Sequence, residues 1–115
     1  MHNTAQQLIG LIDLTNLNEQ AGDSDIMQLC KQAQTPYGNA AAVCVYPHFV
    51  HLAQQQLKDT PIAIATVVNF PAGNQSLLQT QALITQCLAN KADEIDLVLP
   101  YHDFLQGKLN DVRDY

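Results

Sequence analysis

Basic residues are scarce in this sequence, and charged residues of either sign are few. Five Lys and Arg stand against eleven Asp and Glu, so the formal net charge is -6 and the pI is about 4.7. Binding to a phosphate backbone needs a basic face, so we expect no nucleic acid partner. The same sign of charge disfavours an anionic membrane surface.

Long hydrophobic runs are also missing, although hydrophobic residues make up 47% of the 115 positions. No stretch approaches the roughly 18 apolar residues that a membrane-spanning helix needs. The N-terminus has no basic region followed by an apolar stretch, so no secretory signal is visible. The three cysteines form no Cys-x-x-Cys pair, which argues against a disulfide framework. We therefore expect one cytoplasmic domain with reduced, buried thiols.

Four apolar stretches predict strands, at residues 8–14, 40–46, 62–68 and 95–99. The last three are nearly continuous, as in parallel strands that are covered on both faces. The first stretch does not predict a strand as clearly, because a short helix could run into it. Long amphipathic connections between the stretches predict an α/β fold of order β-α-β-α-β-α-β, either an open doubly wound sheet or part of a β/α barrel.

Helical spacing identifies the buried side of each connecting helix. We expect Asp23 or Ser24 to cap the first helix and Ser76 to cap the third. The expected inward residues of the three helices in turn are Ile26, Leu29, Cys30 and Ala33, then Val50, Ala53 and Leu57, then Leu77, Thr80, Ile84, Cys87 and Leu88.

The end of the chain predicts a helix that is too short. It begins near Asn110 and reaches only Tyr115, whereas roughly 12 residues are needed for a helix of useful stability. A crossover helix after a fourth strand normally leads to a fifth strand. We therefore expect the chain to be shortened.

Two carboxylates stand in or beside predicted strands. Asp96 lies between Ile95 and Leu97; it is either a buried carboxylate arranged for proton transfer or an edge residue that faces water. Asp13 is expected near the carboxyl end of the first strand, where β/α folds bind ligands, but taken by itself the residue is better explained by an Asx-turn that ends the strand. Asp93 and Glu94 have the character of solvated loop residues.

Other candidate groups have simpler explanations. His48 and His51 lack a third ligand nearby, so surface histidines are favoured over a metal site. Cys44 has no basic neighbour, which favours a core thiol over a nucleophile. None of the four lysines lies in an apolar strand, where desolvation would lower the pKa of an amine. The loop at 69–74 indicates a turn, with weaker support for an anion site at the helix that follows.

Four segments taken together closely resemble the deoxyribose-phosphate aldolase family. They occur in the family's order and with nearly its spacing, at residues 11–17, 35–47, 64–74 and 92–101. The resemblance implies a (β/α)8 TIM barrel, of which residues 1–115 would be the N-terminal half, an incomplete barrel of about four strands. It also implies a class I aldolase that uses a lysine Schiff base, without a metal or cofactor, to cleave 2-deoxyribose 5-phosphate reversibly into glyceraldehyde 3-phosphate and acetaldehyde.

The resemblance also assigns candidate site residues. Asp96 corresponds to the catalytic aspartate that relays protons around the carbinolamine and Schiff base, and Asp13 is placed with it as a second catalytic candidate. The positions that line or closely support the substrate pocket are Thr15, Leu17, Cys44 and Phe70.

The chain departs from the family in one important respect. Both essential lysines belong to later strands, and Lys91, where the family usually has glycine, matches no catalytic position. We therefore expect this polypeptide alone to form no Schiff base. The alternative is a non-catalytic α/β module that binds a partner or small ligand. In either case open strand edges predict a homo-oligomer or pairing with a C-terminal half.

Overall fold

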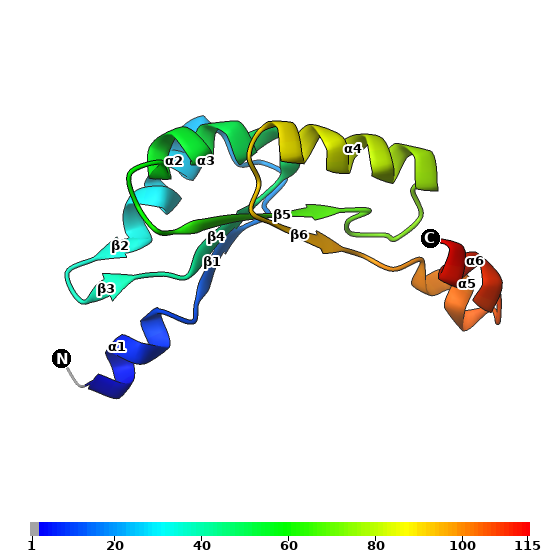
Figure 1. Cartoon of the computed structure of the whole chain (residues 1–115), viewed down its shortest axis with the longest axis horizontal. Helices are drawn as coiled ribbons and strands as arrows, with labels where there is room; N and C mark the ends of the chain where they lie inside the picture. The colour runs from blue at the N-terminus through cyan, green and yellow to red at the C-terminus, as the bar shows by residue number, and fades with distance from the viewer. Residues whose placement is uncertain (1–2) are drawn as a thin grey trace.

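Four parallel strands form the central sheet of the structure, a computed structural model that describes residues 3–115 (Figure 1). Their order across the sheet is β1-β4-β5-β6, so each strand lies beside the next long strand of the chain. A doubly wound sheet would reverse its order at a switch point, whereas barrel strands follow one another in sequence. The arrangement is therefore that of a partial β/α barrel. The strands are β1 (Asp13–Asn16), β4 (Ala42–Val45), β5 (Ala63–Val68) and β6 (Glu94–Leu97).

Three helices form one layer on one side of this sheet (Figure 1). They are α2 (Asp23–Gln32), α3 (Val50–Leu57) and α4 (Leu77–Ala89). Figure 1 also shows α1 and the α5–α6 pair at opposite ends of the molecule. The smaller elements are α1 (Asn3–Ile9), the hairpin strands β2 (Gln34–Thr35) and β3 (Gly38–Asn39), the 3-10 turn η1 (Pro47–Phe49), α5 (Tyr101–Leu105) and α6 (Leu109–Asp114).

The expected first strand needs correction. Leu8 and Ile9 belong to α1, and β1 begins only at Asp13. Pairing with the sheet begins at Asp13, which is the first residue of the chain with a strand partner, Ala42 of β4. The other three expected strands are confirmed, with ends that differ by at most two residues. The antiparallel β2–β3 hairpin was not expected; it turns at Pro36 and Tyr37, and Gly38, which begins β3, has a φ of 128° that suits glycine.

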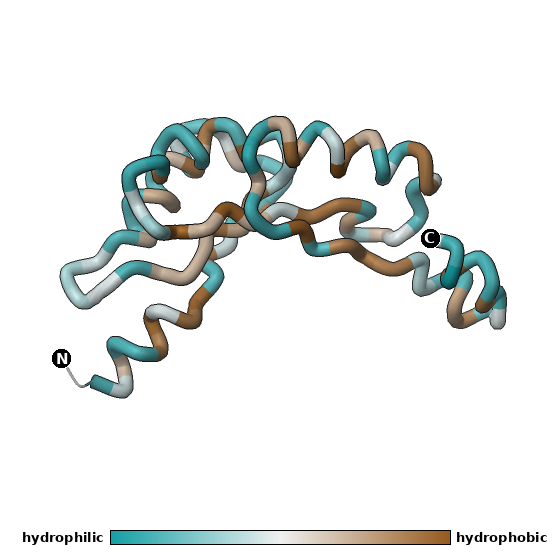
Figure 2. The backbone as a smooth tube through the Cα atoms, in the orientation of Figure 1, coloured by the Kyte–Doolittle hydropathy of each residue, from teal (hydrophilic) through white to brown (hydrophobic). Residues whose placement is uncertain are grey.

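The main core lies between the sheet and α2 and α3. The expected inward residues of these two helices are all buried. The expectation for α4 is only partly correct, because Thr80 and Cys87 are buried while Leu88 is 58% exposed. The main contact of α4 in the described chain is with β5, so its outer side remains in solvent. Figure 2 shows the apolar segments concentrated along the strands.

Helix capping follows the expectation at one of two sites. The Ser76 hydroxyl accepts from the Gln79 amide at 3.1 Å, and the Gln79 side chain accepts from the Ser76 amide at 3.0 Å, so a complete capping box begins α4. Gly22, rather than Asp23 or Ser24, is the N-cap of α2. Its amide donates to the Asp25 carboxylate at 2.8 Å, which supplies the second half of a capping box.

The molecule is elongated and exposes an unusually large surface. Its radius of gyration is 16.1 Å, whereas a compact domain of this length has about 13 Å. Its accessible surface is 7296 Å², against about 6,200 Å² for a compact monomer of this mass. The excess reflects a sheet that helices cover mainly on one side. Within residues 3–115, every helix is too short or too polar to cross a membrane.

Candidate functional site

The side of the sheet opposite α2, α3 and α4 carries most of the candidate residues. We call it the inner face. Because side chains alternate along a strand, the register brings Thr15, Cys44, Ala65 and Glu94 into one row across the four strands. Asp13 lies two residues before this row on β1. Asp96 lies two residues after it on β6, opposite Val67.

Cys44 is the buried centre of this face, with an exposed fraction of 5%. Burial raises the pKa of its thiol to about 11, and the carboxylates of Asp96, Asp13 and Glu94 add to the increase, in that order. A hydrogen bond from the Thr15 hydroxyl acts in the opposite direction. The thiol is therefore protonated at neutral pH, which agrees with a core thiol and not with a nucleophile. All three cysteines are free and buried, as expected.

The structure places Asp96 and Asp13 on opposite edge strands of this face. They are three strand spacings apart across the sheet, about 14 Å, and four residues apart along the strands, about 13 Å, which gives a separation of about 19 Å; both are exposed. Asp96 is therefore an exposed residue of an edge strand and not a buried carboxylate, because in the described chain β6 has a neighbour on one side only and its burial pattern leaves Asp96 open to solvent. Asp13 begins β1 and does not end it, so the expected position was wrong. The Asx-turns belong instead to Asn16 and Asn18, whose side chains accept from backbone amides at 3.0 and 2.9 Å.

Glu94 is a candidate residue that sequence reasoning missed. It is the first residue of β6 and lies opposite Ala65 on the inner face, whereas we expected a loop residue. Asp93 is an exposed loop residue, as expected, although its carboxylate accepts from the Ile64 amide and its own amide donates to the Ile64 carbonyl, both at 2.8 Å. Two acidic residues in succession resemble a loop in the sequence. The available signal for a strand was the alternation of polar and apolar residues from Glu94 to Leu97.

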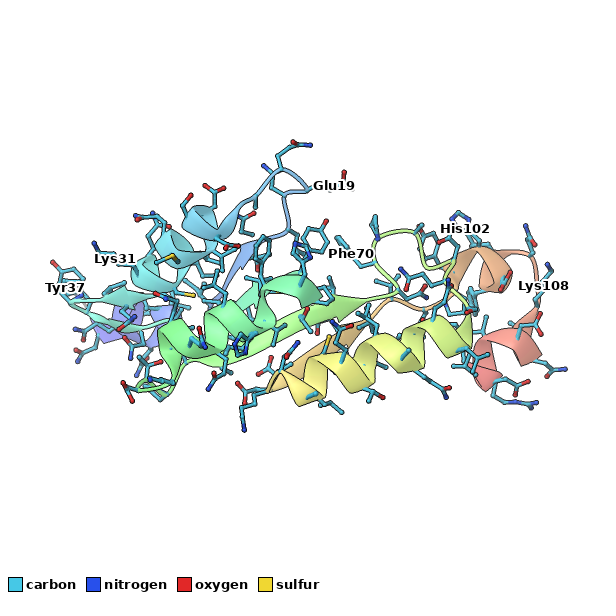
Figure 3. All side chains as sticks on the ribbon, turned by 90° about the horizontal axis from the view of Figure 1, so that it is seen from above. Glu19, Lys31, Tyr37, Phe70, His102 and Lys108 are labelled. Carbon is cyan, nitrogen blue, oxygen red and sulfur yellow. The ribbon has the colours of Figure 1, made fainter. Side chains whose placement is uncertain are left out.

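Leu17 and Phe70 pack against the buried inner-face cluster of Cys44, Ala65 and Val67. Phe70 also meets the Tyr46 ring edge-on, with ring centroids 5.9 Å apart. Beside these rings is a hollow of about 250 Å³ at the carboxyl ends of the strands, lined by Glu19, Tyr46, His48, Phe70 and Pro71. Figure 3 shows Glu19 and Phe70 on the same side of the molecule.

Asn69 connects the ends of β5 and β6. It is 1% exposed, and its side-chain amide donates to the Val98 carbonyl at 2.7 Å. Its side-chain oxygen accepts from the Gln75 amide at 2.8 Å. The loop at residues 69–74 is therefore a turn that is tied to both strands, and it begins with Asn69 in the left-handed region at a φ of 57°.

The four lysines lie outside the inner face, whereas His48 lines the hollow beside Phe70. Lys31, Lys58, Lys91 and Lys108 are all exposed, in helices or turns, and Lys31 and Lys108 lie toward opposite ends of the molecule (Figure 3). His48 and His51 are exposed, as expected. No group of three or more His, Cys, Asp or Glu side chains in the described part of the chain is arranged to hold a metal ion.

Solved structures of similar fold are larger than this chain. A protein from Coccidioides immitis, described as a candidate deoxyribose-phosphate aldolase, is 33% identical and superposes with a TM-score of 0.87 over 93% of this chain and 42% of its own. A candidate deoxyribose-phosphate aldolase from Toxoplasma gondii shares 22% identity, with a TM-score of 0.81 over 94% of this chain and 41% of its own. A tetrameric deoxyribose phosphate aldolase from Aeropyrum pernix shares 23% identity, with a TM-score of 0.73 over 80% of this chain and 38% of its own.

The chain thus spans less than half the length of these relatives. At 22% and 23% identity the last two structures support the fold alone. A sequence model of the family described as DeoC/LacD family aldolases matches residues 7–112, which is nearly the whole chain. This protein therefore belongs to the DeoC/LacD family of aldolases.

Proposed function

We propose that this chain forms the acid-bearing wall of a class I aldolase site for 2-deoxyribose 5-phosphate. In the proposed reaction, a lysine amine adds to the carbonyl carbon of the sugar and the carbinolamine loses water to give a Schiff base. Loss of the proton from the β-hydroxyl group breaks the bond between the α and β carbons, which releases glyceraldehyde 3-phosphate and leaves an enamine. Protonation of the enamine at its α carbon and addition of water then release acetaldehyde and the free amine. Asp96 is the proposed catalytic residue that moves protons to and from the carbinolamine oxygen and nitrogen.

One observation carries this proposal: Asp96, Cys44, Thr15 and Asp13 share the inner face of the sheet. β/α barrels hold their substrates at the carboxyl ends of their strands. Asp96 lies in the carboxyl half of β6, and the hollow beside Phe70 lies at the same end of the sheet. Thr15, Leu17, Cys44 and Phe70 are proposed to shape the apolar side of the pocket, and Asp13 is a second catalytic candidate.

The attacking amine is proposed to come from a polypeptide segment other than these 115 residues. All four lysines are exposed on helices or in connecting segments, and none has the desolvated, apolar surroundings that activate a Schiff-base lysine. The chain alone, incubated with acetaldehyde and borohydride, should therefore show no stoichiometric reduced adduct at any one lysine by intact mass and peptide mapping. A stoichiometric adduct at one lysine would contradict this assignment.

A chimera tests the proposed activity. Residues 7–112 would replace the matching segment of the Coccidioides immitis relative, and cleavage of deoxyribose 5-phosphate would be followed. We expect activity that falls at least about 100-fold in Asp96→Asn, the lower range for a general acid–base group. Asp111→Asn, a change of the same kind at an exposed position of α6, is the matched control. A folded but inactive chimera, or one insensitive to Asp96→Asn, would contradict the proposal.

The second candidate function is a self-associating, non-catalytic module. The large exposed surface and the edge strands β1 and β6 favour association. The carboxylates of Asp13, Glu94 and Asp96 oppose direct stacking of two inner faces, because like charges would meet. Edge-to-edge pairing is therefore the favoured mode. Light scattering over a concentration series distinguishes the cases, since a monomer at high concentration would exclude this candidate.

A further inference from the structure

Asn69 occupies a position that asparagine fills at a cost. Its φ of 57° lies in the left-handed region, where glycine is the least strained residue and asparagine is tolerated. Its side chain is nearly completely buried, with an exposed fraction of 1%. A buried amide is unfavourable unless its donor and acceptor both find partners. The structure provides both partners.

The two bonds of the Asn69 amide run to segments far apart in the sequence. The side-chain nitrogen donates to the Val98 carbonyl, just beyond β6, and the side-chain oxygen accepts from the Gln75 amide, just before α4. The Asn69 carbonyl also accepts from the Gly73 amide at 2.9 Å. The next backbone link between the strands is from the Val98 amide to the Val68 carbonyl at 3.1 Å. Asn69 thus ties the loop that carries Phe70 to the end of the strand that carries Asp96.

The loop has little freedom to adopt another path. A Cβ atom on Gly73 would lie 2.5 Å from the Leu99 carbonyl oxygen and 3.0 Å from the Tyr101 ring. The Tyr101 hydroxyl lies 3.4 Å from the Pro71 carbonyl. Phe70, which follows Asn69 directly, is thereby directed onto the inner-face cluster of Cys44, Ala65 and Val67.

We propose that Asn69 is a positioning residue, which holds Phe70 over Cys44 and in a constant position relative to the end of β6. This inference deepens the proposed function, because the aromatic side of the pocket and the strand of Asp96 then move as one unit. Asn69 itself need not touch a substrate. Its role is exerted through Phe70 on one side and through Val98 on the other.

The cysteines of the 115-residue chain provide a test that does not depend on activity. In Asn69→Gly the backbone keeps its favoured φ, while both side-chain bonds are lost. Phe70 should then cover Cys44 less well, and alkylation of Cys44 by iodoacetamide at pH 8.5 should accelerate at least tenfold. Cys30 and Cys87 are even more deeply buried than Cys44, at 1% and 0% exposure against 5%, and they lie in α2 and α4. Their alkylation rates, measured by mass spectrometry, serve as a control because they rise only if the whole fold opens.

The selectivity of the change decides the outcome. Acceleration at Cys44 alone supports the proposal, whereas equal acceleration at all three cysteines, or none, overturns it. Asn69→Asp keeps the acceptor for the Gln75 amide but loses the donor to Val98, so we expect an intermediate rate. Asn74→Asp, an exposed residue of the same loop, is the matched control and should leave all three rates unchanged.

The chimera adds a functional measurement. Under conditions where circular dichroism shows a fully folded protein, Asn69→Gly should lower kcat at least tenfold, with a smaller loss in Asn69→Asp. A residue that only stabilises the fold would lower the melting temperature and leave kcat of the folded enzyme unchanged, which would overturn the positioning role. If the parent chimera is inactive, the proposed function fails, while the cysteine measurement still decides whether Asn69 positions Phe70.

Discussion

The carboxylate of Asp96 raises the pKa of the Cys44 thiol, although the two residues lie two strands apart in the sheet. Both side chains are on the inner face, and the side chains of β5 that lie between them there are Ala65 and Val67. These side chains carry no charge and no hydrogen-bonding group that could shield the interaction. The thiol of Cys44 is therefore a natural probe for charges on the inner face.

Removal of the Asp96 charge should make Cys44 easier to ionise. In Asp96→Asn the pKa of Cys44 should fall from about 11, because a neighbouring negative charge disfavours a thiolate. It should stay above 9.0, since burial is the larger cause of the increase. The pH dependence of the alkylation rate of Cys44 measures this pKa. Asp103→Asn, at a residue of α5, should leave it unchanged, and an unchanged pKa in Asp96→Asn would refute the assigned interaction.

Alkaline pH should destabilise the fold through the same thiol. Below pH 9 Cys44 is protonated in both the folded and the unfolded chain, so its ionisation does not lower the free energy of unfolding. Between pH 9 and about 11 only the unfolded chain ionises, and the free energy of unfolding falls by at most about 3 kcal/mol. Urea unfolding at several pH values should show a steeper loss for the parent chain than for Cys44→Ala. Parallel curves would contradict the prediction.

Gly73→Ala should destabilise the chain more than the same change at Gly107. Both glycines have positive φ, 69° and 79°, so alanine is strained at both positions. Only at Gly73 would the new Cβ also meet other atoms, the Leu99 carbonyl oxygen and the Tyr101 ring. We expect a loss of about 1–2 kcal/mol at Gly107 and a clearly larger loss at Gly73. Chemical denaturation measures both, and equal losses would show that the loop relaxes freely.

Thr66→Val should remove a buried hydrogen bond at nearly constant volume. The Thr66 hydroxyl is fully buried on the helix-covered face and donates to the Val45 carbonyl at 2.7 Å. Its loss should lower the free energy of unfolding by about 1 kcal/mol. Thr85→Val is the matched control, because the Thr85 hydroxyl donates to the Gln81 carbonyl at an exposed site of α4. A loss at Thr66 no larger than at Thr85 would contradict the prediction.

Local patterns in the sequence predicted the covered side of the molecule well. The spacing of Ile26 and Leu29 in α2, and of Val50, Ala53 and Leu57 in α3, identified helix faces that the structure buries. Ser76 was recognised as a helix cap from its side chain alone. These features depend on contacts within a few residues or on one apolar stripe, and such information is present in any short window of sequence.

The open side of the molecule was predicted less well. Glu94 has the same character in sequence as the loop residue before it, and only its pairing with Ala65 makes it part of the inner face. The side chain of Asn69 is bonded to Val98, and no local signal reveals this partner. Leu88 fits the apolar stripe of α4 but is 58% exposed, because a stripe is buried only where another element covers it.

By itself the sequence determined the α/β class, the order of the main strands and helices, the buried helix faces and the family resemblance. Only the tertiary structure decided that Asp13, Cys44, Glu94 and Asp96 share one face, and that Asn69 joins the ends of two strands. The physical reason is that parallel strands are paired through crossovers of many residues. Their register follows from packing of the whole sheet against its helices, and one residue of slip would turn each of these side chains to the opposite face.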